Sequence, residues 1–324
     1  MFEKMKKLKP ISGFIKPISG IVLLIGLFLI IDIKQVQDVL IKTETNKVVF
    51  ALFFGIFANI ISIYRWKLIL KLMYGDFTLT WLVCVFGQSL SLNSVLPGGI
   101  VGGDVFRSYS VASKLPKGRK KIGPKSVIVD RFCGLWSVVI ISMISGLIIF
   151  LTISFEENHN LFKYYLLFLF AVTITPFLAR TNFSKKILVK FEKNSNLIIF
   201  KIKQIIKLAK TASNYLVASF LLSLITTLFA VLNFWFCLQA VQVEIALIQL
   251  LFCSTFIFLS SVVPFSFAGF GPRELGSVAI LSLYGFAGEA LLVASVLYGL
   301  TTIFQGIMCL PLFLKPPKDP FMKN

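Results

Sequence analysis

The chain has 324 residues, of which 57% are hydrophobic and 15% are charged, and it carries a formal net charge of +19. Several apolar runs reach the roughly 20 residues that cross a bilayer, which excludes a soluble protein and predicts an all-α polytopic membrane protein. The basic residues flank these runs, so they indicate membrane orientation and argue against binding of nucleic acid.

The first half of the chain predicts three full spans and one broken segment. A short basic tail precedes the first span, at residues 18–33, and a loop of mixed charge leads to the second span, at residues 48–64. Residues 79–112 form an apolar segment that a stretch of proline and glycine interrupts. A strongly basic loop follows, and the third span covers residues 131–155.

The second half also predicts three full spans and one broken segment, together with a linking helix. Spans at residues 161–178, 214–239 and 290–314 surround a second broken segment at residues 245–286. Between the first two of these spans, residues 181–210 interleave lysines with isoleucines at helical spacing. This pattern predicts a basic amphipathic helix on an anionic lipid surface, with a solvated linker helix as the alternative.

The two broken segments share one pattern, in which an apolar run meets proline, then glycine, then charged residues. The first, SLSLNSVLPGGIVGGDVFR, contains Pro97 and Gly102, and the second, SSVVPFSFAGFGPRE, contains Pro264 and Gly269. The two prolines and the two glycines are separated by the same number of residues, close to half of the chain length. This equal spacing indicates an internal duplication.

The duplication predicts a single transmembrane domain over residues 1–324, built from a repeat at 18–155 and a second repeat at 161–314. Each repeat has three spans plus one re-entrant broken hairpin, which makes six full spans and two hairpins, or eight to ten helices by other counts. Three crossings is an odd number, so the second repeat is inverted. With both termini in the cytoplasm, most lysines and arginines lie on the cytoplasmic side, as the positive-inside rule requires. Inverted repeats with broken helices indicate a transporter.

Four strings carry a resemblance to a known family: LNSVLPGGIVGGDVFRSYSVASK, SVIVDRFCGLW, VVPFSFAGFGPREL and EALLVASVLYGL. Together they resemble the lysylphosphatidylglycerol synthase transmembrane-domain family, also called flippase-like integral membrane proteins. Asp130 stands where glutamate is more usual. The resemblance implies a domain that moves phospholipids or other lipid-linked head groups between leaflets. The chain ends about ten residues after the last span, so we expect it to lack the aminoacyl-transferase domain of the full synthases.

Charged residues next to the broken segments are the first candidates for a substrate site. A charge in mid-membrane costs roughly 2.5–3.5 kcal/mol, so Arg107 and Arg273 need partners. Asp104 precedes Arg107 by one helical turn and Glu274 adjoins Arg273, so each arginine has a carboxylate in reach. We expect the arginines to hold a lipid phosphate and the carboxylates to orient them. The alternative is that both are structural ion pairs near the interface.

Glycines in the same segments let the backbone bend and offer free N–H groups to an anion, or they merely permit close helix packing. These candidate glycines are Gly102, Gly103, Gly269 and Gly271. Asn93 is expected to line a polar path. Asp130 and Arg131 open the third span, where they either close the cavity as a gate or cap the helix. The five cysteines lie in apolar segments without ligand spacing, so we expect no metal ion and no other cofactor.

These patterns favour a lipid flippase of the cytoplasmic (inner) membrane that has no enzymatic activity. Its expected partners are a membrane phospholipid or a polyprenyl-linked lipid, together with the anionic lipid surface. One alternative is a membrane partner that assists a lipid synthase on another chain without transport. Another is an integral membrane lipid or glycosyl transferase, although the available carboxylates lie beside arginines, a poor setting for a divalent cation.

Overall fold

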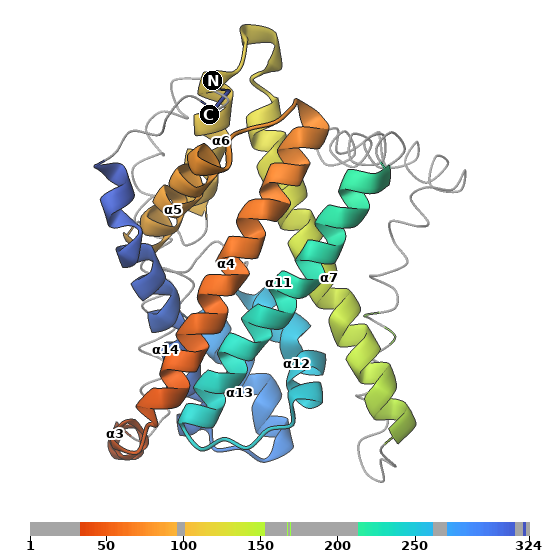
Figure 1. The fold of residues 1–324 in the computed structure, drawn as a ribbon. Coiled ribbons are helices and arrows are strands. Elements are labelled where there is room, and N and C mark those ends of the chain that lie inside the picture. Colours follow the sequence, from red (N-terminus) through yellow and green to blue (C-terminus); the bar gives the residue numbers. More distant parts are fainter. Residues whose placement is uncertain are drawn as a thin grey trace, which may run out of the picture.

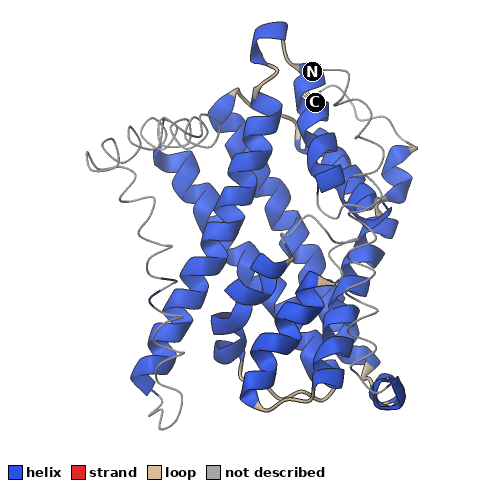
Figure 2. Cartoon of the chain, turned by 180° about the vertical axis from the view of Figure 1, so that it is seen from behind, coloured by secondary structure: helices blue, strands red, loops and turns tan. Residues whose placement is uncertain are grey.

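A computed structural model shows the arrangement of the chain (Figure 1). All regular elements among the described residues are helices, as Figure 2 shows from behind. The chain is therefore an all-α protein, as its composition predicts. The structure describes residues 33–95, 101–152, 167, 169, 213–261, 271–314 and 320–321.

Four of the described helices are long and apolar enough to cross a membrane. They are α4 (Thr45–Met73), α7 (Ile122–Thr152), α11 (Ser213–Ala240) and α14 (Gly288–Met308). At 1.5 Å per residue, the 29 residues of α4 extend for roughly 44 Å, more than the hydrocarbon core of a bilayer. Large apolar side chains on the outer faces of these helices remain exposed, as expected of surfaces that face lipid. The chain is thus a polytopic membrane protein.

Two pairs of shorter helices occupy the two predicted broken segments. The first pair is α5 (Leu79–Val95) and α6 (Val101–Lys114), and the second is α12 (Leu247–Ser260) and α13 (Pro272–Leu281). The helices of each pair pack against each other. With 10 to 17 residues each, they are shorter than a full span. Each pair therefore forms a hairpin, as the proline and glycine residues predict.

Helices α4 and α11 run antiparallel along each other. The backbone N–H of Glu44, just before α4, donates to the carbonyl oxygen of Ala240, at the end of α11, at 2.9 Å. Near the other end, the Lys71 Nζ lies 5.8 Å from the centre of the Tyr215 ring. The two hairpins follow α4 and α11 directly, so they start at opposite ends of the molecule (Figure 1).

The same order of elements occurs twice: a long helix, two short helices and a second long helix. This order agrees with the predicted duplication, and the inverted repeat itself stays a prediction. The predicted spans at 18–33 and 161–178 and the amphipathic helix at 181–210 lie outside the described residues, apart from two helical positions in the second of these spans. The remaining described elements are α3 (Ile33–Ile41), η1 (Lys117–Arg119), η2 (Ser282–Tyr284) and η3 (Leu310–Phe313).

Two predicted helix boundaries are wrong. The second span was expected to end at residue 64, but α4 continues to Met73, and the third was expected to begin at residue 131, but α7 begins at Ile122. Charged residues near these boundaries suggested helix ends. Arg65 and Asp130 instead pair with each other at 2.7 Å in the protein interior, so neither charge terminates its helix.

The apolar core of the described residues has one large cluster at each hairpin and a small third cluster between α4 and α7. One cluster packs around Trp66 and Trp81, where α4, α5 and α6 meet. A second, larger cluster packs around Phe234, Leu250 and Leu281, where α11, α12, α13 and α14 meet. Buried polar and charged side chains lie between these clusters, and they form the candidate site.

Candidate functional site

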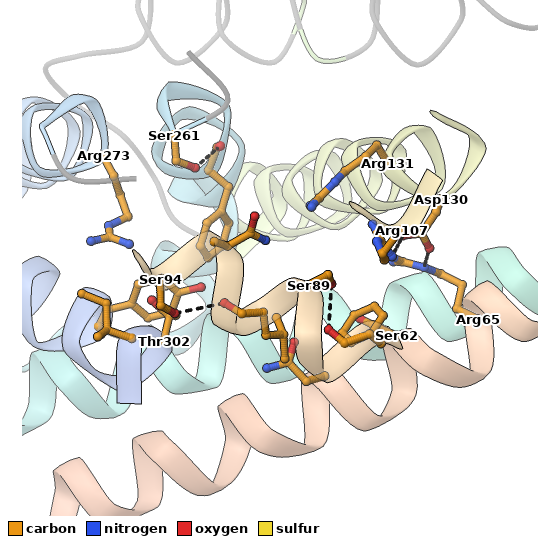
Figure 3. A pocket seen from close by; sticks show the side chains of 17 residues that line it. Ser62, Arg65, Ser89, Ser94, Arg107, Asp130, Arg131, Ser261, Arg273 and Thr302 are labelled. Carbon is orange, nitrogen blue, oxygen red and sulfur yellow. Dashed lines mark hydrogen bonds and ion pairs between the residues drawn. The ribbon is translucent and has the colours of Figure 1, made fainter. Parts of the chain in front are cut away.

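A polar cavity of about 280 Å³ lies where the two hairpins meet the long helices (Figure 3). This volume is just below the roughly 300–1,000 Å³ typical of small-molecule sites. Its apolar lining residues are Phe86, Leu90, Phe258 and Ile303. Its polar lining residues are Asn59, Ser62, Arg65, Ser89, Asn93, Ser94, Arg107, Asp130, Arg131, Ser261, Arg273, Tyr298 and Thr302.

Asp130 lies at the centre of a buried charge network on one side of the cavity. Its Oδ1 accepts from the Arg65 Nε at 2.7 Å, and its Oδ2 accepts from the Arg107 Nη1 at 3.1 Å. Asp130 is 1% exposed and Arg107 is 2% exposed. These three side chains come from α7, α4 and α6, so the ion pairs join three helices that are distant in sequence. A buried carboxylate between two guanidinium groups is well compensated.

Asp104 extends the same network towards the open side of the cavity. Its Oδ1 accepts from the Arg107 Nη2 at 2.8 Å, the contact predicted from their spacing of one helical turn. Both of its oxygens also accept from Arg131, the Nε at 2.7 Å and the Nη2 at 2.8 Å, in a bidentate pair. The Arg131 side chain is 43% exposed.

Within this network, three guanidinium groups meet two carboxylates. We call Arg65, Arg107, Arg131, Asp104 and Asp130 the five-residue network. Its formal charge is positive by one unit, because arginine remains protonated in proteins. The network therefore leaves one positive charge uncompensated by its own members.

Aromatic rings hold Arg107 from its apolar side. The guanidinium carbon lies 5.1 Å from the centre of the Trp66 ring and 5.0 Å from that of Phe86. Both distances suit a cation–π contact, which is stronger when the cation is desolvated. The guanidinium is therefore fixed in orientation by two carboxylates and two rings.

Arg273 lies on the other side of the cavity, on α13, as Figure 3 shows. Its Nη2 donates to the Glu274 Oε1 at 2.6 Å and to the Ser295 carbonyl oxygen at 3.1 Å. Its guanidinium carbon is 5.0 Å from the centre of the Tyr298 ring. The expected pair with Glu274 is thus formed, and Tyr298 takes the place that Trp66 and Phe86 have around Arg107.

Glu274 is fully buried and stabilises the first turn of α13. Its Oε2 accepts from the backbone N–H of Gly271 at 2.6 Å, which satisfies a free donor at the helix N-terminus. Gly271 has a φ of 101°, a conformation that only glycine adopts without strain. Glu274 therefore positions Arg273 and its helix from behind, and it does not line the cavity.

Gly103 brings the two arms of the first hairpin into close contact. A Cβ at this position would collide with the Ser89 carbonyl oxygen and the Asn93 side chain. The backbone N–H of Gly103 donates to the Asn93 Oδ1 at 2.8 Å. Asn93 lines the cavity as expected, so this bond fixes a cavity residue to the start of α6.

The structure brings five of the predicted residues to one cavity, and these are Asn93, Arg107, Asp130, Arg131 and Arg273. Asp104 and Glu274 lie behind them as partners of the arginines. Gly102 is half-buried, Gly103 and Gly271 position the helices, and Gly269 lies outside the described residues. The capping interpretation of Asp130 and Arg131 is wrong, because α7 begins at Ile122 and both side chains join the five-residue network.

Arg65 was missed, because the sequence placed it at the end of the second span. The signal that could have found it is the apolar pattern that continues past it, with Trp66, Ile69 and Leu70 all buried. A cation inside a continuing apolar helix needs a partner, and that partner is Asp130.

An amide pair near the cavity was also missed. The Asn59 Nδ2 on α4 donates to the Gln305 Oε1 on α14 at 2.5 Å. Nearby, Asn233 and Thr301 exchange longer hydrogen bonds between α11 and α14. Polar contacts of this kind join helices in membranes.

Comparison with known proteins identifies the family. Part of the chain is similar to the UPF0104 membrane protein MJ1595 of Methanocaldococcus jannaschii, at 29% identity over 129 residues. The matched part covers 39% of this chain and 38% of that protein. The model of a family described as the lysylphosphatidylglycerol synthase TM region matches residues 18–309, which include both hairpins and every residue that lines the cavity. The chain therefore belongs to the family of the lysylphosphatidylglycerol synthase TM region.

Proposed function

We propose that this protein moves an anionic lipid head group between the two leaflets of the cytoplasmic membrane, without enzymatic turnover. The observation that carries the proposal is the excess of one positive charge in the five-residue network at a polar cavity. A phosphodiester carries one negative charge, so it matches this excess. Arg273 faces the same cavity from the opposite hairpin.

The geometry of the arginines suits a phosphate. Guanidinium groups present paired N–H donors that match two phosphate oxygens, and such charge-assisted bonds are the stronger hydrogen bonds in proteins. Without an anion, Asp104 holds both Arg107 and Arg131. A bound phosphate can take over part of these bonds while Asp130 keeps Arg107 in place.

The position of the cavity supports transport between leaflets. It is lined by residues from the two hairpins, which start at opposite ends of the molecule. Broken helices that meet in this way are typical of transporter sites near the middle of the membrane. The candidate substrates are a phospholipid or a polyprenyl-linked lipid, both of which carry a phosphate.

The orientation follows from the basic residues between α6 and α7. Those exposed at this end are Lys114, Lys117, Arg119, Lys120 and Lys121. By the positive-inside rule this end faces the cytoplasm, where the basic residues also attract anionic lipids. Both termini are assigned to the same side.

Transport by purified protein in vesicles tests the proposal. Arg107→Gln and Arg273→Gln should each lower the rate of phosphatidylglycerol translocation at least tenfold, because each loses a phosphate-binding fork. Arg107→Lys should recover part of the rate, since an ammonium group keeps the charge without the fork. Lys114→Gln, an exposed change on the same helix as Arg107, is the matched control and should transport normally.

Normal transport by Arg107→Gln and Arg273→Gln would overturn the proposed role of the arginines. If the wild-type protein itself moves no lipid, a role as a membrane partner of a lipid synthase is favoured instead. Turnover of the lipid would indicate a transferase. Against that reading, the carboxylates of Asp104, Asp130 and Glu274 are all bonded to arginines, which leaves them poorly suited to a divalent cation.

A further inference from the structure

An apolar groove of about 300 Å³ opens beside the polar cavity, between α4, α5 and the C-terminal part of α14. Its walls include Ile60, Ile63, Val83 and Met308. We call it the α5-side groove. Ile60, Val83 and Met308 are among the exposed large apolar side chains, so the groove faces the bilayer.

The groove and the cavity share a wall. Asn59, Phe86 and Leu90 line both of them. Phe86 also stacks beside Arg107, with 5.0 Å between the ring centre and the guanidinium carbon. Phe86 therefore contacts the positively charged site on one side and lines a groove that is open to hydrocarbon on the other.

A second apolar groove, of about 430 Å³, lies further along the same pair of long helices. It is lined by residues 45–52 of α4 and by residues of α14 that include Leu300, and Ile303 lines both this groove and the cavity. We call it the α3-side groove, because it lies at the end of α4 that follows α3. The α3-side groove therefore lies towards the start of α4, and the α5-side groove lies towards the middle of α4 and the end of α14.

We propose that the two grooves hold an acyl chain of the lipid whose phosphate occupies the cavity, one groove for each leaflet. The substrate class is then an amphiphile with a phosphodiester head and hydrocarbon chains, a glycerophospholipid, rather than a water-soluble anion. The chain stays in hydrocarbon along the α4–α14 pair while the head group passes through the polar cavity. This inference rests on the proposed function, because the groove is assigned through its contact with the phosphate site.

The charge and the apolar surface of the site support this occupant. The cavity carries an excess positive charge, and the adjoining groove is apolar, so together they complement an anionic head with an apolar tail.

Photocrosslinking in vesicles tests the inference with the full-length protein. The probe is phosphatidylglycerol with a diazirine in one acyl chain, and mass spectrometry locates the crosslinked residues. Ile60→Trp fills the α5-side groove without touching the network. Ile144→Trp is its control, because Ile144 lies on α7 and is 48% exposed, against 43% for Ile60. Arg131→Gln removes a half-exposed member of the head-group site and is expected to fold.

We expect crosslinks at Val83 and Met308 of the α5-side groove and at Leu300 of the α3-side groove. The crosslinking yield at the residues of the α5-side groove should fall at least fivefold in both Ile60→Trp and Arg131→Gln. The yield should stay unchanged in Ile144→Trp. Translocation should fall in the same two variants.

Groove crosslinks that Arg131→Gln leaves unchanged would mark ordinary surrounding lipid and would overturn the inference. If translocation depends on Arg107 and Arg131 but the crosslinks lie elsewhere, the inference fails while the proposed function stands. If the wild-type protein shows arginine-dependent groove crosslinks but no translocation, the lipid site is supported and the transport function fails.

Discussion

Asp130 compensates the positive charges of two buried arginines, and it is the least exposed residue of the five-residue network. It is 1% exposed and bonds to Arg65 and Arg107, whereas Asp104 has a side chain that is 21% exposed. Removing one partner from a buried ion pair costs about 3–5 kcal/mol, because the remaining charge stays buried without compensation. The two aspartates should therefore differ in what they contribute to the fold.

Asp130→Asn should lower the free energy of unfolding by about 3 kcal/mol or more, since it leaves both Arg65 and Arg107 without their shared carboxylate. Asp104→Asn, with Arg131 able to turn towards water, should lower it by roughly 1 kcal/mol. Unfolding of the purified variants in mixed detergent micelles measures both values. Equal losses for the two variants would contradict the central position of Asp130.

At the scale of the elements, the first hairpin depends on the close approach of α5 and α6. Gly103 has no room for a Cβ beside Ser89 and Asn93, and its backbone N–H holds the Asn93 side chain. The second hairpin relies on other means, a glycine with positive φ and a buried glutamate at the start of α13. The contacts that hold the arginine-bearing helix in place therefore differ between the two hairpins.

Gly103→Ala should push α6 away from α5 and displace both Asn93 and Arg107. Overpacking of this kind costs about 1–3 kcal/mol, and we expect lipid translocation to fall with it. Gly118→Ala is the matched control, because a Cβ at Gly118 meets no atom within 4 Å. Thermal unfolding and vesicle transport are measured on both variants, and only Gly103→Ala should lose stability and transport. If Gly103→Ala keeps the stability and the transport rate of the wild type, the hairpin relaxes around the added methyl group.

At the scale of the whole molecule, the antiparallel packing of α4 and α11 places the two hairpins at opposite ends. One cavity then receives an arginine from each hairpin. Arg107 and Arg273 are far apart in sequence, yet both line the same cavity. A site that is reached by hairpins from both ends is suited to a substrate that passes between the two sides.

Cysteine labelling measures this topology in intact cells. After the five native cysteines are replaced by serine, Gly118→Cys should react from the cytoplasm and Gly288→Cys from the outside. A side chain fits at both positions, since a Cβ at Gly118 meets nothing within 4 Å and at Gly288 it makes ordinary contact with Val278. Reaction of both variants from the same side would contradict the opposed hairpins. Restoring Cys133, which is buried, gives a negative control.

The sequence by itself determined the membrane class, the two broken segments and the local ion pairs. Long apolar runs and proline–glycine breaks are properties of consecutive residues, so they predict helices and hairpins without knowledge of packing. Asp104 and Arg107 are one helical turn apart, and Arg273 and Glu274 are adjacent. These pairs could therefore be predicted from spacing, and the structure forms both.

Only the tertiary structure decided which charges share a site. Arg65 meets Asp130 because α4 packs against α7, and that packing depends on side chains along both helices. The pairing also explains why two helix boundaries were misplaced: a charge buried with a partner does not end a helix. Arg273 faces the network because the second hairpin enters from the opposite end, and this relation between distant segments is set by how the long helices pack.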